Sequence, residues 1–201
     1  MLRSPHFRRI HERAEFARYF FPELDGITIR LGLAQKRGVL GWGSLDPAAP
    51  GIWVRPRRLE YFTIAHELTH LLQARNLVPR GERQCDLWAL ARSPMLIDTT
   101  PSYLKLPRGM RGRPLSSAQA GALCEAARRA IAAREAGERR YLMRFERELK
   151  ALPGSATRVG TAAIGSAAAV FGAAAQLTAD PPRAVANLFA RLRKRLAGAR
   201  S

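Results

Sequence analysis

A strongly apolar segment between residues 58 and 74 sets the first limit on how this chain folds. Its apolar side chains recur every three or four residues, which is the spacing of a helix that buries one face. Other elements must cover such a helix, because its apolar surface would otherwise lie in water. The same segment carries two imidazoles and a carboxylate, in the order His66-Glu67-Leu68-Thr69-His70. The sequence therefore predicts a buried helix with polar, metal-binding side chains near its middle.

A first helix and three short strands are expected before the apolar helix. Helical spacing predicts the first helix at 5–20, and β-branched and aromatic residues predict strands at 27–31, 39–43 and 51–55. The connections between the strands are short and contain turn residues, which favours antiparallel neighbours. The predicted fold class is therefore α+β, with a small antiparallel sheet, an N-terminal helix, the apolar helix and a helical C-terminal extension.

Further helices are expected after the apolar helix. One is predicted from 82 to 91, and two Ala-rich helices are predicted at 116–136 and 138–151 after a long connection rich in Pro, Gly and Arg. The chain is thus expected to have three parts: a domain at 1–115, a helical extension at 116–152, and an Ala/Gly-rich segment with a basic amphipathic tail at 153–201.

The chain is strongly basic, with 34 Lys and Arg residues against 16 Asp and Glu residues and a net charge of +18. Residues 99–201 hold 19 of these bases and 6 of the acids. A surface of this kind attracts polyanions and anionic membranes, although it does not determine the fold. Nucleic acid is therefore one candidate partner of the basic C-terminal half, and a solvated basic surface is an equal alternative.

Residues 159–177 lack charged side chains and are long enough to cross a bilayer. They consist mainly of Ala and Gly, so a loose helix or a linker is expected there in preference to a membrane span. The basic amphipathic stretch at 183–200 would suit an anionic lipid surface or nucleic acid, or would pack on its own domain. Membrane contact is thus an alternative and not the main expectation.

Two cysteines, Cys85 and Cys124, show no metal-binding spacing and are too few for a disulfide framework. The N-terminus is interrupted by arginines and lacks the apolar core of a secretory signal. These features favour a reduced, cytoplasmic chain. They indicate nothing about the oligomeric state.

The spacing of His66 and His70 places both imidazoles on one face of a helix, one turn apart. That arrangement suits two ligands of one tetrahedral cation, Zn²⁺. Glu67 lies too far around the helix to be a third ligand, but its carboxylate would reach a water on the open position of the ion. Because zinc lowers the pKa of such a water toward about 7, Glu67 is predicted to be the general base.

A third ligand is expected just downstream, where Glu82 and Asp86 are four residues apart and so share one face of the next helix. One of these carboxylates would complete a site of two histidines and one acid, with water in the fourth position. The other would accept the remaining N–H of a ligating imidazole and fix its tautomer. Cys85, between them, is rotated away from both and is expected to pack, with a ligand role as the alternative.

His66-Glu67-x-x-His70 followed by Glu82-x-x-x-Asp86 resembles the gluzincin metallopeptidases, and the layout before it is similar to minimal zincin domains of the SprT-like kind. The resemblance covers about residues 5–95. It implies that Glu82 is the third zinc ligand and that Asp86 supports a histidine. The spacing to Glu82 is shorter than in thermolysin-like enzymes, and the third histidine of SprT-like proteins is absent. Asp86 as the ligand, the aspzincin arrangement, therefore stays open.

The resemblance also implies how a substrate would bind. Zincin-like folds pair an extended peptide with an edge strand above the metal. Residues 52–55 directly precede the apolar helix and are the candidate for this strand, with an internal strand as the alternative. Peptide hydrolysis also needs a hydrogen-bond donor for the developing oxyanion. Tyr103, in the loop after the second helix, is the candidate donor, with packing as the alternative.

The predicted function is that of a zinc-dependent metallopeptidase, a hydrolase that acts on a protein or peptide. By resemblance to SprT-like proteins, proteins held on DNA are one candidate substrate. Two other functions stay open. One is a basic, nucleic-acid-associated binding protein whose zinc is structural and has four protein ligands. The other is a protease at a membrane surface, anchored by residues 159–177 and the basic end.

Overall fold

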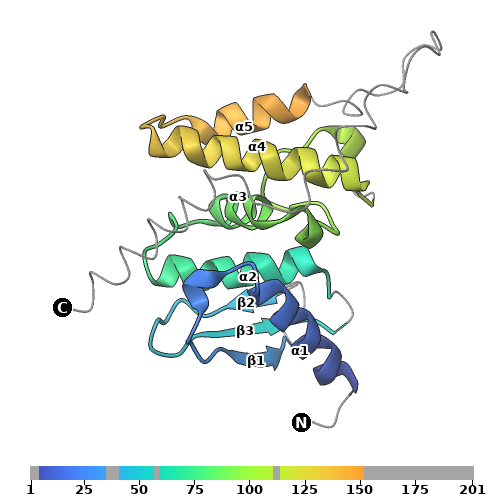
Figure 1. Ribbon diagram of the computed structural model, residues 1–201, viewed down its shortest axis with the longest axis vertical. Helices are drawn as coiled ribbons and strands as arrows, with labels where there is room; N and C mark the ends of the chain where they lie inside the picture. The colour runs from blue at the N-terminus through green and yellow to red at the C-terminus, as the bar shows by residue number, and fades with distance from the viewer. Residues whose placement is uncertain (1–4, 35–40, 57–58, 111–113, 152–201) are drawn as a thin grey trace. The chain divides into compact units, whose positions relative to one another are not determined.

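The computed structural model describes residues 5–34, 41–56, 59–110 and 114–151, which belong to one compact unit, residues 1–156 (Figure 1). The fold class is α+β, as predicted: five α-helices accompany a sheet of three strands. The expectations for the Ala/Gly-rich segment, the basic tail and the membrane alternative fall on residues 152–201 and lie outside the described residues. Among the described residues, no helix is both long enough and apolar enough to cross a bilayer.

The sheet is mixed, which corrects the prediction of an antiparallel sheet. Its order is β1-β3-β2, with β1 (Arg30–Leu33) parallel to β3 (Gly51–Val54) and β2 (Gly41–Gly43) antiparallel to β3. The short connection between β2 and β3 does give the expected antiparallel pair. The prediction was wrong for β1, which was expected to have an antiparallel neighbour. In the structure β1 and β2 lie on opposite edges of β3, and β1 runs in the same direction as β3. The chain between β1 and β3 is long enough for such a parallel crossover.

The two faces of the sheet differ. Ile52 and Val54 are buried, at 1% and 0% exposure, and α2 (Tyr61–Ala74) packs against β2 and β3. The first helix, α1 (Pro5–Arg18), packs mainly on α2 (Figure 1). Since side chains alternate along a strand, Trp42 and Trp53 lie on the opposite face. The sheet thus supports α2 with one face only.

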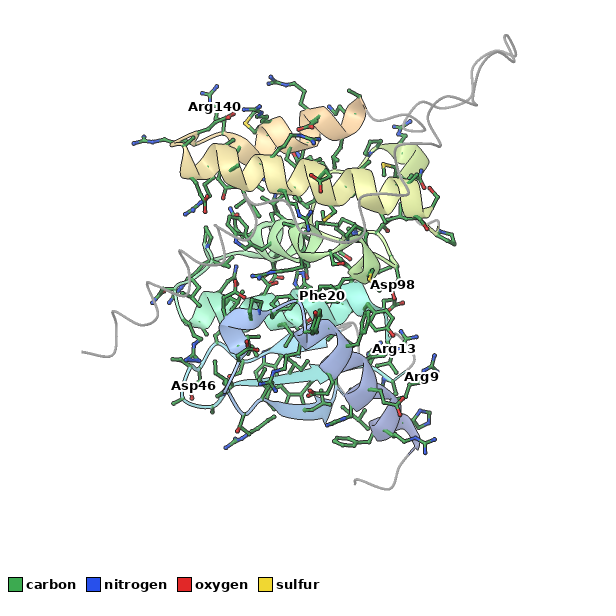
Figure 2. The ribbon with its side chains drawn as sticks, viewed as in Figure 1. Arg9, Arg13, Phe20, Asp46, Asp98 and Arg140 are labelled. Atoms are coloured by element: carbon green, nitrogen blue, oxygen red, sulfur yellow. The ribbon has the colours of Figure 1, made fainter. Side chains whose placement is uncertain are left out.

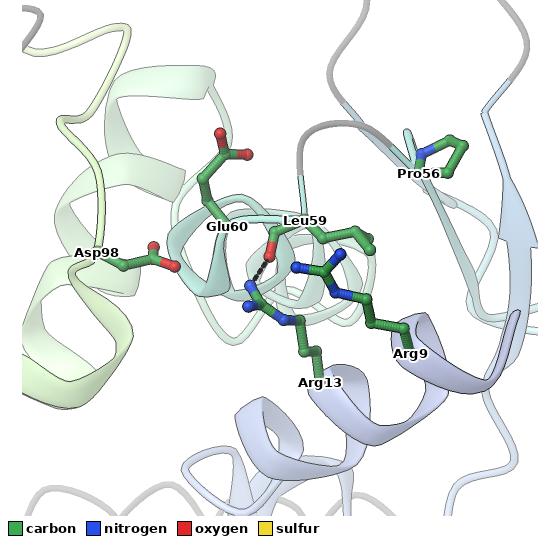
Figure 3. A pocket seen from close by; sticks show the side chains of 6 residues that line it. All are labelled: Arg9, Arg13, Pro56, Leu59, Glu60 and Asp98. Atoms are coloured by element: carbon green, nitrogen blue, oxygen red, sulfur yellow. Dashed lines mark hydrogen bonds between the residues drawn. The ribbon is translucent and has the colours of Figure 1, made fainter. Parts of the chain in front are cut away.

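The N-terminus of α2 is fixed by residues from distant parts of the chain. The Asp98 carboxylate accepts hydrogen bonds from the backbone N–H groups of Tyr61 (2.8 Å) and Phe62 (3.0 Å), which have no partner within the helix. Arg13 of α1 donates a hydrogen bond to the Leu59 carbonyl (Figure 3). A small cavity lies beside these contacts, and it is lined by Arg9, Arg13, Pro56, Leu59, Glu60 and Asp98. The start of the helix that carries His66 and His70 is therefore held in place.

The third helix, α3 (Glu82–Arg92), packs on α2 and lies between α2 and the C-terminal helices of the described residues (Figure 1). Near the end of α3, Arg92 makes a buried ion pair of 2.9 Å with Glu23 of η1 (Pro22–Leu24). The short helices η2 (Pro94–Leu96) and η3 (Arg108–Met110) follow. Residues 94–107 include η2 and connect α3 to η3, and Asp98 within this connection binds the start of α2.

The predicted helical extension consists of α4 (Ser117–Glu135) and α5 (Tyr141–Lys150). A capping box between Ser116 and Gln119 starts α4, which packs on α3, and α5 packs on α4 (Figure 1). Arg83 of α3 pairs with Glu146 at 2.6 Å. The extension is thus attached to the helix that carries the predicted third ligand.

Candidate metal centre

Two imidazole nitrogens and one carboxylate oxygen meet between α2 and α3. The rings of His66 and His70 lie on one face of α2, with centroids 5.0 Å apart. Glu82, the first residue of α3, directs Oε2 to 3.0 Å from His66 Nε2 and 3.4 Å from His70 Nε2. Both imidazoles are largely buried, whereas the Glu82 side chain is 47% exposed. The structure therefore brings the three predicted ligands together at the edge of the core.

The other nitrogen of each imidazole has a partner of its own. His66 Nδ1–H donates to Asp86 Oδ1 at 2.8 Å, and His70 Nδ1–H donates to Gln73 Oε1 at 3.0 Å. Gln73 is itself fixed, because its Nε2 donates to the carbonyls of Pro79 and Gly81. With its only proton on Nδ1, each ring keeps a lone pair on Nε2. In this structure His66 Nε2–H donates to Glu82 Oε2 at 3.0 Å. Without that proton both Nε2 lone pairs would face Glu82, a donor set that suits zinc.

Cys85 offers a second arrangement of donors. Its side chain is fully buried, and ligand atoms of His66, His70 and Cys85 lie within 4.8 Å of one another. The thiol lies 3.2 Å from His70 Nδ1. Burial raises the pKa of the thiol when no cation is bound, whereas a zinc ion beside it would lower that pKa. Glu82 and Cys85 are thus both positioned as candidate third ligands.

The electrostatics of the site favour positive charge beside His66. Burial lowers the pKa of His66, but Asp86, with smaller contributions from Glu67 and Glu82, raises it above the ordinary value. Burial and the neighbouring His66 lower the pKa of His70. The site therefore stabilises one positive charge near His66 but not a second proton on His70. A bound cation would meet the same field from Glu82 and Asp86.

Glu67 is buried beneath β2. A hydrogen bond from the Gly43 backbone reaches its carboxylate, while burial raises its pKa to about 7. A Cβ atom on Gly41 would lie 2.5 Å from Glu67 Oε1, and one on Gly43 would lie 2.7 Å from the Glu67 carbonyl oxygen. Only glycine at both positions lets the strand lie this close to α2. The sequence alone did not predict that Gly41 and Gly43 make room for Glu67. The signal was the Gly-Trp-Gly sequence, because glycines inside a strand often mark a place where another element lies close to its backbone.

The strand beside the site is β2, which corrects the prediction for residues 52–55. Those residues belong mostly to β3, the central strand, and so have no free edge. The position of a strand just before the helix in sequence does not make it an edge strand. Ser44 N–H donates to the Gly51 carbonyl at 2.8 Å, so the alternation of the ladder turns the N–H and C=O of Gly43 away from β3. These groups form the edge nearest Glu67.

Tyr103 lies against the site. Its ring stacks on His66 with centroids 5.6 Å apart and planes 23° apart. Asp86 Oδ2 accepts hydrogen bonds from the backbone N–H groups of Tyr103 (2.6 Å) and Leu104 (3.2 Å). Burial and the charges of Glu82 and Asp86 raise the pKa of the phenol, so it stays protonated and able to donate. A cavity of about 450 Å³ opens beside it, lined by residues 100–106.

Comparisons of the chain with protein-family models, curated proteins and solved structures give no match. The geometry of the site is therefore what supports an assignment of function.

Proposed function

We propose that the protein is a zinc-dependent metallopeptidase that hydrolyses peptide bonds in a protein or peptide substrate. The observation that carries the proposal is the meeting of His66 Nε2, His70 Nε2 and Glu82 Oε2 beside a buried Glu67. The pattern is that of the gluzincin metallopeptidases, which the motifs resemble. A catalytic zinc site combines three protein ligands with one open position.

His66, His70 and Glu82 would hold the ion, and the residues around them fit that role. Zinc bound there would polarise a carbonyl oxygen and lower the pKa of a water toward about 7. Asp86 is less suited to be a ligand, because Oδ1 accepts from His66 Nδ1 and Oδ2 accepts from the loop backbone. It would instead hold His66 in the tautomer that ligates through Nε2.

Glu67 would move the proton during hydrolysis. Its carboxylate takes a proton from water as the water oxygen attacks the peptide carbonyl carbon, and returns it to the amine nitrogen as the C–N bond breaks. The carboxylate is shielded by β2, and the backbone of Gly43 holds it in place. Tyr103 is a candidate donor to the developing oxyanion, because its ring already stacks on a ligand.

A peptide would bind in an extended conformation along β2. The Gly43 N–H donates to Glu67, whereas the Gly43 C=O points away from β3 and would accept a hydrogen bond from the backbone of the substrate. This places the scissile bond between the strand edge and the imidazoles. Recognition would then depend on the backbone and accept varied side chains.

The proposal is tested by zinc analysis and a peptidase assay on three variants. Glu67→Gln is expected to keep zinc and to lose turnover by at least about 100-fold, because the carboxamide cannot accept the proton. Glu82→Ala is expected to lose zinc, and with it activity. Glu12→Gln, an exposed change on α1, is the control and should retain both. An active Glu67→Gln variant would contradict the assignment of the base.

A structural zinc site is the second candidate function, and the position of Cys85 favours it. With Glu82 and Cys85 both bound, the ion would have four protein ligands and no open position. Cys85→Ala distinguishes the two functions: a metallopeptidase keeps its zinc and its activity in this variant, whereas a structural site loses the ion.

A further inference from the structure

Two stacked indoles lie on the face of the sheet opposite α2. Trp42 of β2 and Trp53 of β3 are direct partners in the antiparallel ladder, and their ring centroids lie 4.4 Å apart with planes tilted by 33°. Trp42 is 56% exposed. Because the described residues leave more than half of this indole in solvent, core packing explains little of its position. Another role is therefore expected for Trp42.

Two glycines allow Trp53 to lie flat against the sheet. A Cβ atom on Gly51 would lie 2.7 Å from Trp53 Cη2, and a Cβ atom on Gly32 of the neighbouring strand would overlap Trp53 Cδ1. The indole therefore covers two positions that bear no side chain. Trp42 stacks on this flat ring and becomes the outer layer. We call Gly32, Trp42, Gly51 and Trp53 the tryptophan platform.

The platform lies in basic surroundings. The Cβ atom of Arg30 lies 3.1 Å from the Cβ position of Gly51, where the Trp53 ring also ends. None of the residues of the three strands is acidic. The next acid after β2, Asp46, lies in the loop to β3 (Figure 2). Its carboxylate accepts the Ala48 N–H.

We propose that the tryptophan platform binds single-stranded nucleic acid, with a base stacked on Trp42 and a phosphate against Arg30. Bases present flat aromatic faces, and each stacked base contributes about 1–3 kcal/mol without sequence preference. Stacked indoles beside a cation suit a ligand that is both aromatic and anionic. A polyanion without bases would leave the indoles without a stacking partner, and a neutral sugar would leave the charge of Arg30 unmatched. The net charge of +18 would speed capture of such a ligand.

This inference goes beyond the peptidase proposal and is independent of it. The platform is on the face of the sheet away from α2, and it includes none of the groups that would hold zinc. Glu82→Ala should therefore bind nucleic acid as the unaltered protein does, even though it loses zinc. A loss of both properties in Glu82→Ala would count against a separate platform.

The experiment measures binding of the full chain to an oligothymidylate of about 15 nucleotides, with heparin as a polyanion that lacks bases. Trp42→Ala is expected to weaken oligothymidylate binding about tenfold and to leave heparin binding unchanged, because only stacking is lost. Trp42→Phe should restore most of the affinity. Tyr19→Ala, which removes an aromatic ring 83% exposed at the end of α1, is the matched control and should change neither.

Three results would overturn the proposal. The first is unchanged oligothymidylate binding by Trp42→Ala. The second is an equal loss of heparin and oligothymidylate binding, which would show a purely ionic surface. The third is displacement of the oligonucleotide by a neutral oligosaccharide. Arg30→Ala gives a further readout, since loss of one phosphate contact should reduce the salt dependence of binding by about one ion.

Discussion

At the scale of single residues, Asp86 connects the candidate metal centre to the loop that follows α3. One carboxylate oxygen accepts from His66 Nδ1, and the other accepts from the backbone of residues 103 and 104. The side chain is 1% exposed, so these partners replace the water that a carboxylate would otherwise bind. Asp86 therefore fixes both the tautomer of His66 and the place of the Tyr103 ring.

Replacing Asp86 with Asn should weaken zinc binding by about 10- to 100-fold without abolishing it. The amide has a single acceptor oxygen, which cannot serve both the imidazole and the loop. Competition with a chromophoric zinc chelator measures the change. Asp46→Asn, in the loop between β2 and β3, should bind zinc as the unaltered protein does. Complete loss of zinc in Asp86→Asn would instead identify Asp86 as a direct ligand.

Glu67 gives the metal-stripped protein a specific dependence on pH. Burial, with a smaller contribution from Glu82, raises its pKa from 4.5 to about 7. The folded state thus favours the protonated form, so the contribution of this group to stability is full below pH 4.5 and is lost as the pH rises through 7. Glu67→Gln mimics the protonated form at every pH.

Relative to Glu67→Gln, the metal-stripped protein should lose on the order of 3 kcal/mol of unfolding free energy between pH 4.5 and 8. Urea unfolding of both proteins at the two pH values measures this difference, because all other titrating groups cancel. A difference that stays constant with pH would mean that the Glu67 carboxylate is solvated in the folded state.

At the scale of elements, β2 lies so close to α2 that its glycines shape the position of Glu67. Gly41→Ala should displace the Glu67 carboxylate, since the new methyl would lie 2.5 Å from Oε1. Peptidase turnover is expected to fall about 10- to 100-fold with zinc content unchanged. Gly121→Ala on α4, where nothing lies within 4 Å, is the control for a glycine change and should leave turnover as it is. Full turnover in Gly41→Ala would show that the carboxylate does not need this clearance.

The N-terminus of α2 depends on a cap from another element. Asp98→Ala removes the acceptor of two backbone N–H groups and should cost about 1–2 kcal/mol of unfolding free energy. Thermal unfolding would record this as a melting temperature several degrees lower. Asp25→Ala, at another exposed aspartate, should have little effect. An equal loss in both variants would argue that the effect comes from charge and not from the cap.

At the scale of the whole molecule, α2 and α3 supply all three proposed ligands, so the ion would join two helices of the core. Zinc in 100-fold excess over its dissociation constant should stabilise the fold by about 2.7 kcal/mol. The melting temperature should therefore rise with added zinc and fall again with a chelator. Glu82→Ala should show neither change, and a zinc-dependent shift that survives in Glu82→Ala would place the ion elsewhere.

The parts that sequence reasoning predicted are those that depend on local spacing. The helical repeat alone places His66 beside His70 and Glu82 beside Asp86, because residues four apart share a face. The order of the strands was not predictable in this way, since the pairing of β1 with β3 depends on contacts between distant segments. The edge role of β2 was missed for the same reason. From the sequence, Gly41 and Gly43 are only residues with a low preference for strands. The structure gives the reason for them, because Glu67 lies too close for any larger side chain.

Residues 82–86 at the start of α3 contact both α2 and α5. Glu82 and Asp86 contact the imidazoles of α2, while Arg83 pairs with Glu146 and Gln84 accepts a hydrogen bond from Tyr141, both on α5. A rotation of α3 that shortened its contacts with α2 would lengthen its contacts with α5. The C-terminal helices therefore cannot drift independently of the histidine pair, and substitutions on α5 should need compensating changes at positions 82–86 over evolutionary time.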